Sequence, residues 1–431
     1  MRNNKFLKSL LAGALSITML AGAIPVSAEE TTAPDTEPVA PRTLIVTKNL
    51  ETTPGTTLPA FTFNFQLQYV SAELPEGTPL TPNGLTVATP APAGSHGAWA
   101  PGAEWRTMGS AATPATSGAD LPANNTVTAD SQNLLAGITF PNAGEFTFLL
   151  REQADTNTLV NDGGIEEDMT YDGTIYEVRV WVHRDAAGDL FVAGVHVWLQ
   201  GDRDTTSETT LTAGKVDDVE FNNEFVREVD GTYCPEDEYP CEPGDFDTGL
   251  RVSKTIAGDA ASPTSSFVFT GTLTHASDLI PATRTYNAFI YNADGTRVTT
   301  GPGSTGTPIV FSSGSNTTFN LVGGQELRFA ALPVGTQFQI SEDPGAYTAS
   351  HVLLVNGGTV TGATGQTASN TGGPHRVGQD GANYAAFTNT RTTAPITGLL
   401  ADNLPFVLVG IAAVGFIGLL AVSRRRRAYE A

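Results

Sequence analysis

Short runs of alternating apolar and polar residues, separated by turn residues, recur along most of the chain. The clearest pair covers residues 176–182 and 190–199, and a turn over 184–189 would join these two runs into a hairpin. Few stretches show the apolar period of a helix. We therefore predict an all-β fold in two β-rich blocks, residues 42–227 and residues 248–392.

Both ends of the chain carry an apolar run beside basic residues. Residues 1–28 combine basic side chains, an apolar run and a small-residue cleavage site, which is typical of a secretory signal peptide; the alternative is an uncleaved membrane anchor. Residues 404–422 are almost wholly apolar and are followed by four arginines at 424–427. This order predicts a transmembrane span with a basic cytoplasmic tail.

A short motif stands just before the second apolar run. Residues 394–398 read Ala-Pro-Ile-Thr-Gly, which resembles the Leu-Pro-x-Thr-Gly signal that sortases cleave between Thr and Gly. We predict that residues 393–431 form a sorting segment in which Pro395, Thr397 and Gly398 carry the signal. The resemblance implies that a sortase transfers the acyl group of Thr397 to an amine, either on peptidoglycan or on a lysine of another protein. The protein would then be secreted and anchored to the cell wall.

The composition excludes some classes of partner. The formal net charge is −22 at pH 7, which repels nucleic acid and anionic membranes. Residues 29–41, rich in Thr, Pro and Glu, are predicted to form an unstructured leader. An acidic connector, residues 228–247, holds Cys234 and Cys241, which should form a disulfide outside the membrane. Two thiols without a nearby histidine are too few ligands for a structural metal site, and we expect no cofactor.

The two blocks share three short signatures in the same order. Each block opens with an alternating strand that ends in lysine, later has a strand that ends in glutamate, and finishes with Phe-x-Asn. Residues of equal parity in a strand share a face, so these polar side chains are predicted to point into the apolar core of their block. The inward positions are Lys48, Glu152 and Asn223 in the first block, and Lys254, Glu342 and Asn389 in the second; Asn222 has the opposite parity and should point outward.

Burial of these side chains has a chemical consequence. It favours a neutral lysine amine and a protonated glutamic acid, because an isolated buried charge is costly. The amine is then a nucleophile, and the acid can polarise the asparagine carboxamide and carry protons while ammonia leaves. We therefore predict a Lys–Asn isopeptide bond in each block, with Glu152 and Glu342 as the catalytic residues. The alternative is an ordinary buried salt bridge beside a hydrogen-bonded asparagine.

The Lys, Glu and Phe-x-Asn strands resemble the isopeptide-forming, immunoglobulin-like domains of Gram-positive backbone pilins, the T-antigen-like major pilin family. The resemblance covers both blocks and implies two tandem CnaB-type β-sandwiches. It also implies that Lys48 is joined to Asn223 and that Lys254 is joined to Asn389. Each bond would connect the first strand of its block to the last, so that tension bypasses most of the domain.

The small number of lysines narrows the function. After signal cleavage the chain keeps three lysines, and two of them already belong to the predicted bonds. In the family that the chain resembles, a sortase joins the C-terminal Thr of one subunit to a lysine of the next. We therefore predict that Lys215 is the intersubunit acceptor and that other copies of this chain are partners. The alternative is a plain surface lysine.

We accordingly expect a backbone pilin subunit that is a sortase substrate and not itself an enzyme. One alternative is a monomeric wall-anchored adhesin that binds a host or glycan receptor. The Pro-rich segment 74–121 would then be its binding loop, although it is also typical of a solvated loop. A surface hydrolase is a second alternative, but the histidines are scattered and neither Gly-x-Ser-x-Gly nor His-Glu-x-x-His is evident.

Overall fold

A computed structural model describes residues 42–74, 85–87, 98–102, 104–201, 215–232, 248–360 and 369–393. Within these ranges all helical or strand structure is β-strand, so the predicted all-β fold is confirmed. Over the same ranges, no helix is long and apolar enough to cross a membrane. The signal peptide, the leader, both cysteines, the sorting motif and the apolar run 404–422 lie outside the described residues.

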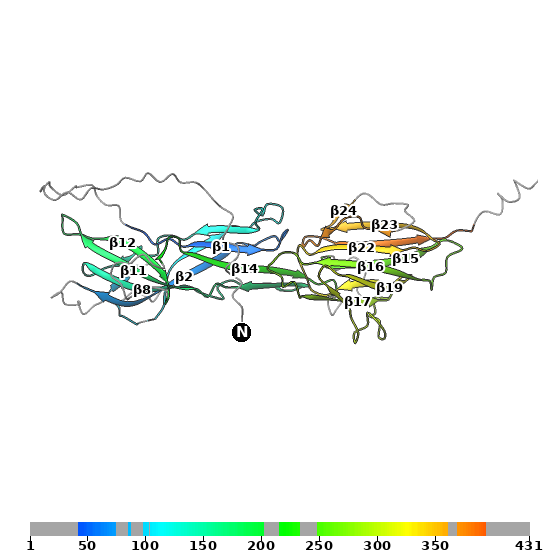
Figure 1. Ribbon diagram of the computed structural model, residues 1–431, viewed down its shortest axis with the longest axis horizontal. Helices are drawn as coiled ribbons and strands as arrows, with labels where there is room; N and C mark the ends of the chain where they lie inside the picture. Colours follow the sequence, from blue (N-terminus) through cyan, green and yellow to red (C-terminus); the bar gives the residue numbers. More distant parts are fainter. Residues whose placement is uncertain are drawn as a thin grey trace, which may run out of the picture. The chain divides into compact units, whose positions relative to one another are not determined.

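Two sheets of the first block enclose one apolar core (Figure 1). Aromatic rings join the sheets across this core: the ring centroids of Phe65 and Phe221 are 5.5 Å apart. One sheet has the order β6 (Thr126–Asp130), β1 (Thr47–Thr52), β14 (Glu220–Val229), β10 (Ile165–Thr170) and β9 (Asn161–Asp162). The other has the order β13 (Lys215–Val216), β12 (Leu190–Leu199), β11 (Ile175–Arg184), β8 (Gly144–Glu152), β2 (Phe61–Glu73) and β5 (Arg106–Thr113).

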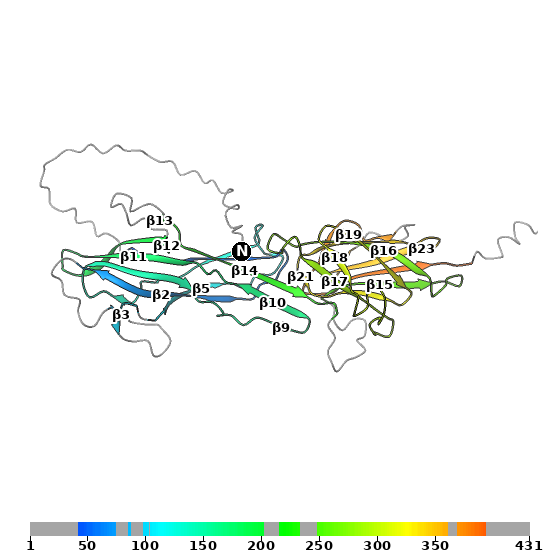
Figure 2. The same cartoon turned by 60° about the horizontal axis from the view of Figure 1, so that its bottom comes forward.

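The alternation along the chain explains this sandwich. In β2, buried residues alternate with more exposed ones from Phe61 to Tyr69, so that one face of the strand enters the core. The predicted hairpin is also confirmed, since β11 and β12 pair antiparallel from Tyr176 opposite Leu199 to Arg184 opposite Leu190. Figure 2 shows β14 beside β10, and β10 pairs in turn with β9.

Part of the segment 74–121 belongs to the fold, so its interpretation as a surface loop is wrong for that part. β5 is a strand of the second sheet and pairs with β2. A small third sheet combines β3 (Leu85–Val87), β4 (Ala98–Trp99) and β7 (Ile138–Thr139), and both Leu85 and Trp99 are buried in the core. The many prolines and glycines of this segment obscure any alternation of apolar and polar residues, although Leu85 and Trp99 are buried in the core.

The second block is another sandwich of two sheets around its own core. One sheet has the order β18 (Ile309–Ser312), β17 (Thr285–Tyr291), β20 (Glu326–Phe329), β15 (Leu250–Ala257), β27 (Asn383–Thr390), β23 (Thr348–Val355) and β24 (Gly358–Val360). The facing sheet has the order β19 (Asn316–Val322), β16 (Ser266–Thr274), β22 (Gln337–Asp343) and β25 (Ser369–Asn370), and β26 (His375–Arg376) also pairs with β22. The remaining strand of this block is β21 (Leu332–Pro333).

In each block the first and last strands are parallel neighbours, β1 with β14 and β15 with β27. The expectation that each first strand ends at its lysine is wrong, because β1 continues to Thr52 and β15 to Ala257. In β1 the alternation persists beyond Lys48: Leu50 and Thr52 are buried, whereas Asn49 and Glu51 are more exposed.

Candidate functional site

The lysine and the asparagine of the first block lie on neighbouring strands. β1 pairs with β14 in a register that places Lys48 opposite Phe221 and Leu50 opposite Asn223. Lys48 and Asn223 are therefore offset by two residues, and equal parity turns both side chains toward the core. Their exposed fractions are 0% and 1%. The core face of this strand pair thus presents an amine beside a carboxamide.

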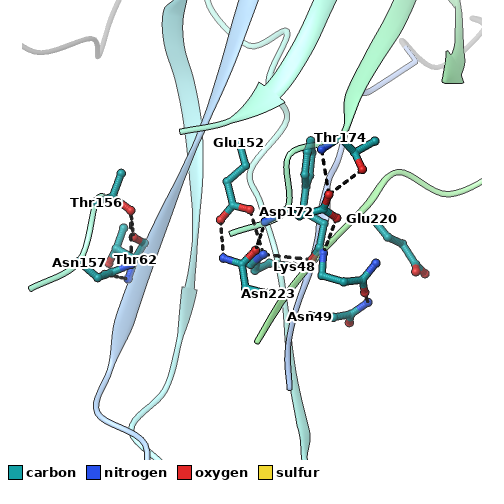
Figure 3. Close-up of polar contacts among 12 residues, drawn as sticks. Lys48, Asn49, Thr62, Glu152, Thr156, Asn157, Asp172, Thr174, Glu220 and Asn223 are labelled. Carbon is teal, nitrogen blue, oxygen red and sulfur yellow. Dashed lines mark hydrogen bonds and ion pairs between the residues drawn. The ribbon is translucent and has the colours of Figure 1, made fainter. Parts of the chain in front are cut away.

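Glu152 reaches the same point from the facing sheet, where it is the last residue of β8. Its Oε2 accepts a hydrogen bond from Lys48 Nζ at 3.1 Å, and its Oε1 accepts one from Asn223 Nδ2 at 2.9 Å (Figure 3). Lys48 Nζ also donates to the backbone oxygen of Phe221 at 3.2 Å. The carboxyl group therefore contacts both the amine and the carboxamide, each through its own oxygen.

Burial shifts both ionisable groups toward their neutral forms. Desolvation lowers the pKa of Lys48 to about 8, although the charge of Glu152 acts in the opposite direction. Desolvation also raises the pKa of Glu152, against the opposing effects of the Lys48 charge and the hydrogen bond from Asn223. The two pKa values thus approach each other, which makes a proton transfer from the amine to the carboxylate less costly than in water.

The second block repeats this geometry. β15 and β27 place Lys254 opposite Phe387 and Ile256 opposite Asn389, so the lysine and the asparagine again differ by two residues in register. Glu342 comes from β22 in the facing sheet, and its Oε1 lies 2.5 Å from Lys254 Nζ and accepts a hydrogen bond from Asn389 Nδ2 at 2.9 Å. All three side chains are buried, and desolvation lowers the pKa of Lys254.

One aromatic ring lies beside each of the two amines. Lys48 Nζ lies 4.8 Å from the ring centroid of Phe63, and Lys254 Nζ lies 4.3 Å from that of Phe267. Such a site keeps bulk water away from the amine and its carboxyl partner. The arrangement can therefore do more than hold an ion pair, because the carboxamide adds an electrophilic carbon and a potential leaving group beside the nucleophile.

One residue of the first site was missed from the sequence. The backbone N–H of Asp172, in the loop between β10 and β11, donates to Asn223 Oδ1 at 2.8 Å. In the second block, Asn389 Oδ1 is buried without a hydrogen-bond partner among the described residues. The Asp-Gly pair at 172–173 does indicate a turn, but strand parity gives no information about which loop approaches the asparagine.

Lys215 lies apart from both trios. It begins the short edge strand β13, opposite Trp198 of β12, and is half-buried. It lines a cavity of about 230 Å³ together with Thr43, Asp130 and Asp217. The other predicted site residues, Pro395, Thr397, Gly398, Cys234 and Cys241, lie outside the described residues.

Two family models match the chain, one in each block. Residues 44–226 match the Spy0128-like isopeptide containing domain, and residues 248–391 match a domain of unknown function, DUF7601. No curated protein matches. Similar solved structures include the major pilin from Streptococcus pyogenes, with 18% identity, a TM-score of 0.31 and coverage of 82% of this chain and 100% of that one. The T-13 major pilin of Streptococcus pyogenes has 19% identity, a TM-score of 0.28 and coverage of 82% and 98%.

The fold and the site define a class of protein: a tandem β-sandwich protein with a buried Lys–Glu–Asn trio in each sandwich. The first block is a Spy0128-like isopeptide containing domain. This domain match supports the resemblance to Gram-positive pilins that the sequence motifs carry.

Proposed function

We propose that this protein is the backbone subunit of a covalent, sortase-assembled pilus that is anchored to the cell wall and serves adhesion. The observation that carries this proposal is the recurrence of a buried Lys–Glu–Asn trio with the same strand register in both blocks. A single buried trio is compatible with an ordinary ion pair. Two trios with one geometry, each linking the first strand of a sandwich to the last, suit subunits that carry load along a fibre.

In each trio the lysine amine attacks the carboxamide carbon of the asparagine. A new N–C bond forms, the C–Nδ2 bond breaks, and one ammonia leaves per cross-link. The glutamate takes a proton from the attacking amine and supplies one to the leaving nitrogen, so it ends unchanged. The contacts of Glu152 with Lys48 Nζ and Asn223 Nδ2 support this role, as do those of Glu342 with Lys254 and Asn389.

The bonds would change how the sandwich bears tension. Without them, a pulling force shears the hydrogen bonds between β1 and β14, which are individually weak. With a covalent Lys48–Asn223 link, force passes directly from the first strand to the last, and residues 49–222 are bypassed. The Lys254–Asn389 link acts in the same way in the second block. The subunit then resists extension even when its sheets are perturbed.

Polymerisation would join Thr397 of one subunit to Lys215 of the next, with sortase as the transferring enzyme and peptidoglycan as the final acceptor. Two observations support this role for Lys215. The other two lysines of the mature chain are buried in the trios, whereas Lys215 is half-buried on an edge strand and lines a cavity. A sortase acceptor needs an amine that the acyl enzyme can reach, and an edge strand provides one.

The test compares boiled cell-wall extracts from the native host that carries wild type, Lys215→Ala or Lys215→Arg. We expect a high-mass ladder on an immunoblot for the wild type and a single species for both variants. Lys215→Arg is the matched control because it keeps the positive charge but not a lysine amine. A ladder that survives both substitutions would exclude Lys215 as the acceptor, and a single species in all three strains would favour a monomeric surface protein.

A further inference from the structure

The carboxamide of Asn223 is held at both of its ends. Its Nδ2 donates to Glu152 Oε1 at 2.9 Å, and its Oδ1 accepts the backbone N–H of Asp172 at 2.8 Å (Figure 3). A carboxylate oxygen accepts and a backbone N–H donates, so these two partners determine which end of the carboxamide is the oxygen. The carbonyl oxygen therefore already contacts a donor before any bond forms.

The N–H of Asp172 is itself held in place by the side chain of the same residue. Asp172 Oδ1 accepts hydrogen bonds from the backbone nitrogen of Thr174 at 2.9 Å and from its hydroxyl at 2.6 Å, which closes a turn. Asp172 Oδ2 accepts one from the backbone nitrogen of Asn222 at 2.9 Å. Because Asn222 precedes Asn223 in β14, the carboxylate ties the loop to the strand that carries the reacting side chain.

We propose that the backbone N–H of Asp172 stabilises the negative charge that develops on Asn223 Oδ1 during cross-linking, and that the Asp172 carboxylate positions this N–H. The inference rests on the proposed Lys48–Asn223 bond. When Lys48 Nζ attacks the carboxamide carbon, the electrons of the C=O bond move onto Oδ1. When they return, the C–Nδ2 bond breaks and ammonia leaves, while the N–H of Asp172 keeps its proton throughout.

The second block gives the contrast. Asn389 Nδ2 donates to Glu342 Oε1 as in the first block, but among the described residues no donor reaches Asn389 Oδ1. A preorganised donor at a developing oxyanion is typically worth about 100- to 1,000-fold in rate. The Lys48–Asn223 bond should therefore form faster than the Lys254–Asn389 bond of the same molecule.

The test measures both cross-links in one chain. Full-length ectodomain is made by cell-free synthesis, collected directly into denaturant before it folds, and then refolded by dilution. Samples quenched over time are digested, and mass spectrometry follows the loss of ammonia from each Lys–Asn pair. Asp172→Pro removes the N–H; Asp172→Ala keeps it but removes the acceptors of the turn. We expect Asp172→Pro to slow the first bond by about 100-fold or more, and Asp172→Ala to slow it less, with the second bond unchanged.

Asp185→Ala is the matched control. Asp185 also caps a turn of the first block, where its Oδ1 accepts from the backbone nitrogens of Ala187 and Asp189, but it does not contact the trio. It should leave both rates unchanged. Asp172→Asn, which keeps an acceptor for Thr174, should restore part of the rate that Asp172→Ala loses.

The outcomes separate this inference from the function on which it rests. A wild-type chain that loses no ammonia at either pair would overturn the isopeptide bonds themselves. Normal bonds in the wild type, with the first bond equally fast in folded Asp172→Pro, would overturn only the role of Asp172. If Asp172→Pro does not fold, Asp172→Ala decides: a first bond that forms at the wild-type rate in that variant would equally reject the inference.

Discussion

The two Lys–Glu–Asn trios share one strand register and differ around the asparagine. In both blocks the lysine is offset by two residues from the asparagine on a parallel neighbour. In the first block each oxygen of the glutamate contacts one partner, whereas Oε1 of Glu342 contacts both Lys254 and Asn389. Asn223 Oδ1 accepts the N–H of Asp172, and Asn389 Oδ1 has no counterpart donor among the described residues.

This difference separates two requirements of a cross-link. Bringing an amine to a carboxamide depends on the register of two parallel strands, and both blocks meet this requirement in the same way. Stabilising the charge of the reaction depends on a loop, and here the blocks diverge. The two blocks also match different family models, which accords with a common strand geometry in different surroundings.

The largest expected effect is on stability. Asn223→Ala and Asn389→Ala each remove one cross-link that closes a loop of well over a hundred residues, which should lower the free energy of unfolding by roughly 5 kcal/mol. The loop-closure contribution varies only slowly with loop length, so similar losses are expected in the two blocks. Calorimetry or chaotrope unfolding of the ectodomain, with the two blocks resolved, checks this.

Asn222→Ala is the control for that comparison. Asn222 lies in the same strand as Asn223 but is exposed, with the opposite parity. This variant should keep both cross-links and nearly all of the stability. Equal unfolding midpoints for Asn222→Ala and Asn223→Ala would contradict a Lys48–Asn223 bond. A much larger loss in one block than in the other would show that its fold depends on more than loop closure.

The next effect concerns the carboxyl groups of the two trios. Glu152→Ala should slow the first bond by about 100- to 10,000-fold and leave the second unchanged, and Glu342→Ala should do the reverse, since each acid acts only on its own trio. Intact mass and peptide mapping after refolding check this. Glu167→Gln is the control, because Glu167 is a buried acid of the first block that pairs with Arg227 outside the trio. Loss of both ammonia molecules at the normal rate in Glu152→Ala would remove its assigned role.

The sequence allows much of the site to be predicted because strand parity is a local property. It indicates that Lys48, Glu152 and Asn223 all face the core, and the structure places them in contact. Parity carries no information about which strands are neighbours, so the parallel pairing of β1 with β14 and its register emerge only from the folded sheets. Asp172 could not be predicted for a related reason: its N–H reaches Asn223 through the path of a loop.

Strand ends were harder to predict than strand faces. The polar residues Asn49 and Glu51 obscure the continuation of β1. Over a few residues, a polar side chain at an outward-facing position of a strand cannot be distinguished from a polar residue that ends the strand. The buried strand pieces of the segment 74–121 were hidden in a similar way. Their apolar residues are separated by prolines and glycines, and the burial of Trp99 and Leu85 depends on contacts with a core that is distant in sequence.

The smallest effect is the dependence of the first cross-linking rate on pH. The reactive state, with a neutral amine and a protonated acid, holds as many protons as the ion pair. Its population therefore does not change with pH while Lys48 and Glu152 share one proton. Desolvation lowers the pKa of Lys48 to about 8, and above that pH the pair loses this proton. The rate should be flat near neutrality and fall about tenfold per pH unit above roughly pH 8.

Refolding in buffers of increasing pH, with ammonia loss followed at each pair, checks this profile. Raising the pH removes the proton that Glu152 must supply to the leaving nitrogen, so a falling upper limb supports its action as an acid. A rate that instead rises through pH 8 would show that only the neutral amine is limiting and that Glu152 acts purely as a base. Burial also lowers the pKa of Lys254, so the rate of formation of the second bond should also fall at high pH. If the rate falls at high pH in one block only, the two carboxyl groups act differently in the reaction, even though the lysine and the asparagine have the same strand register in both blocks.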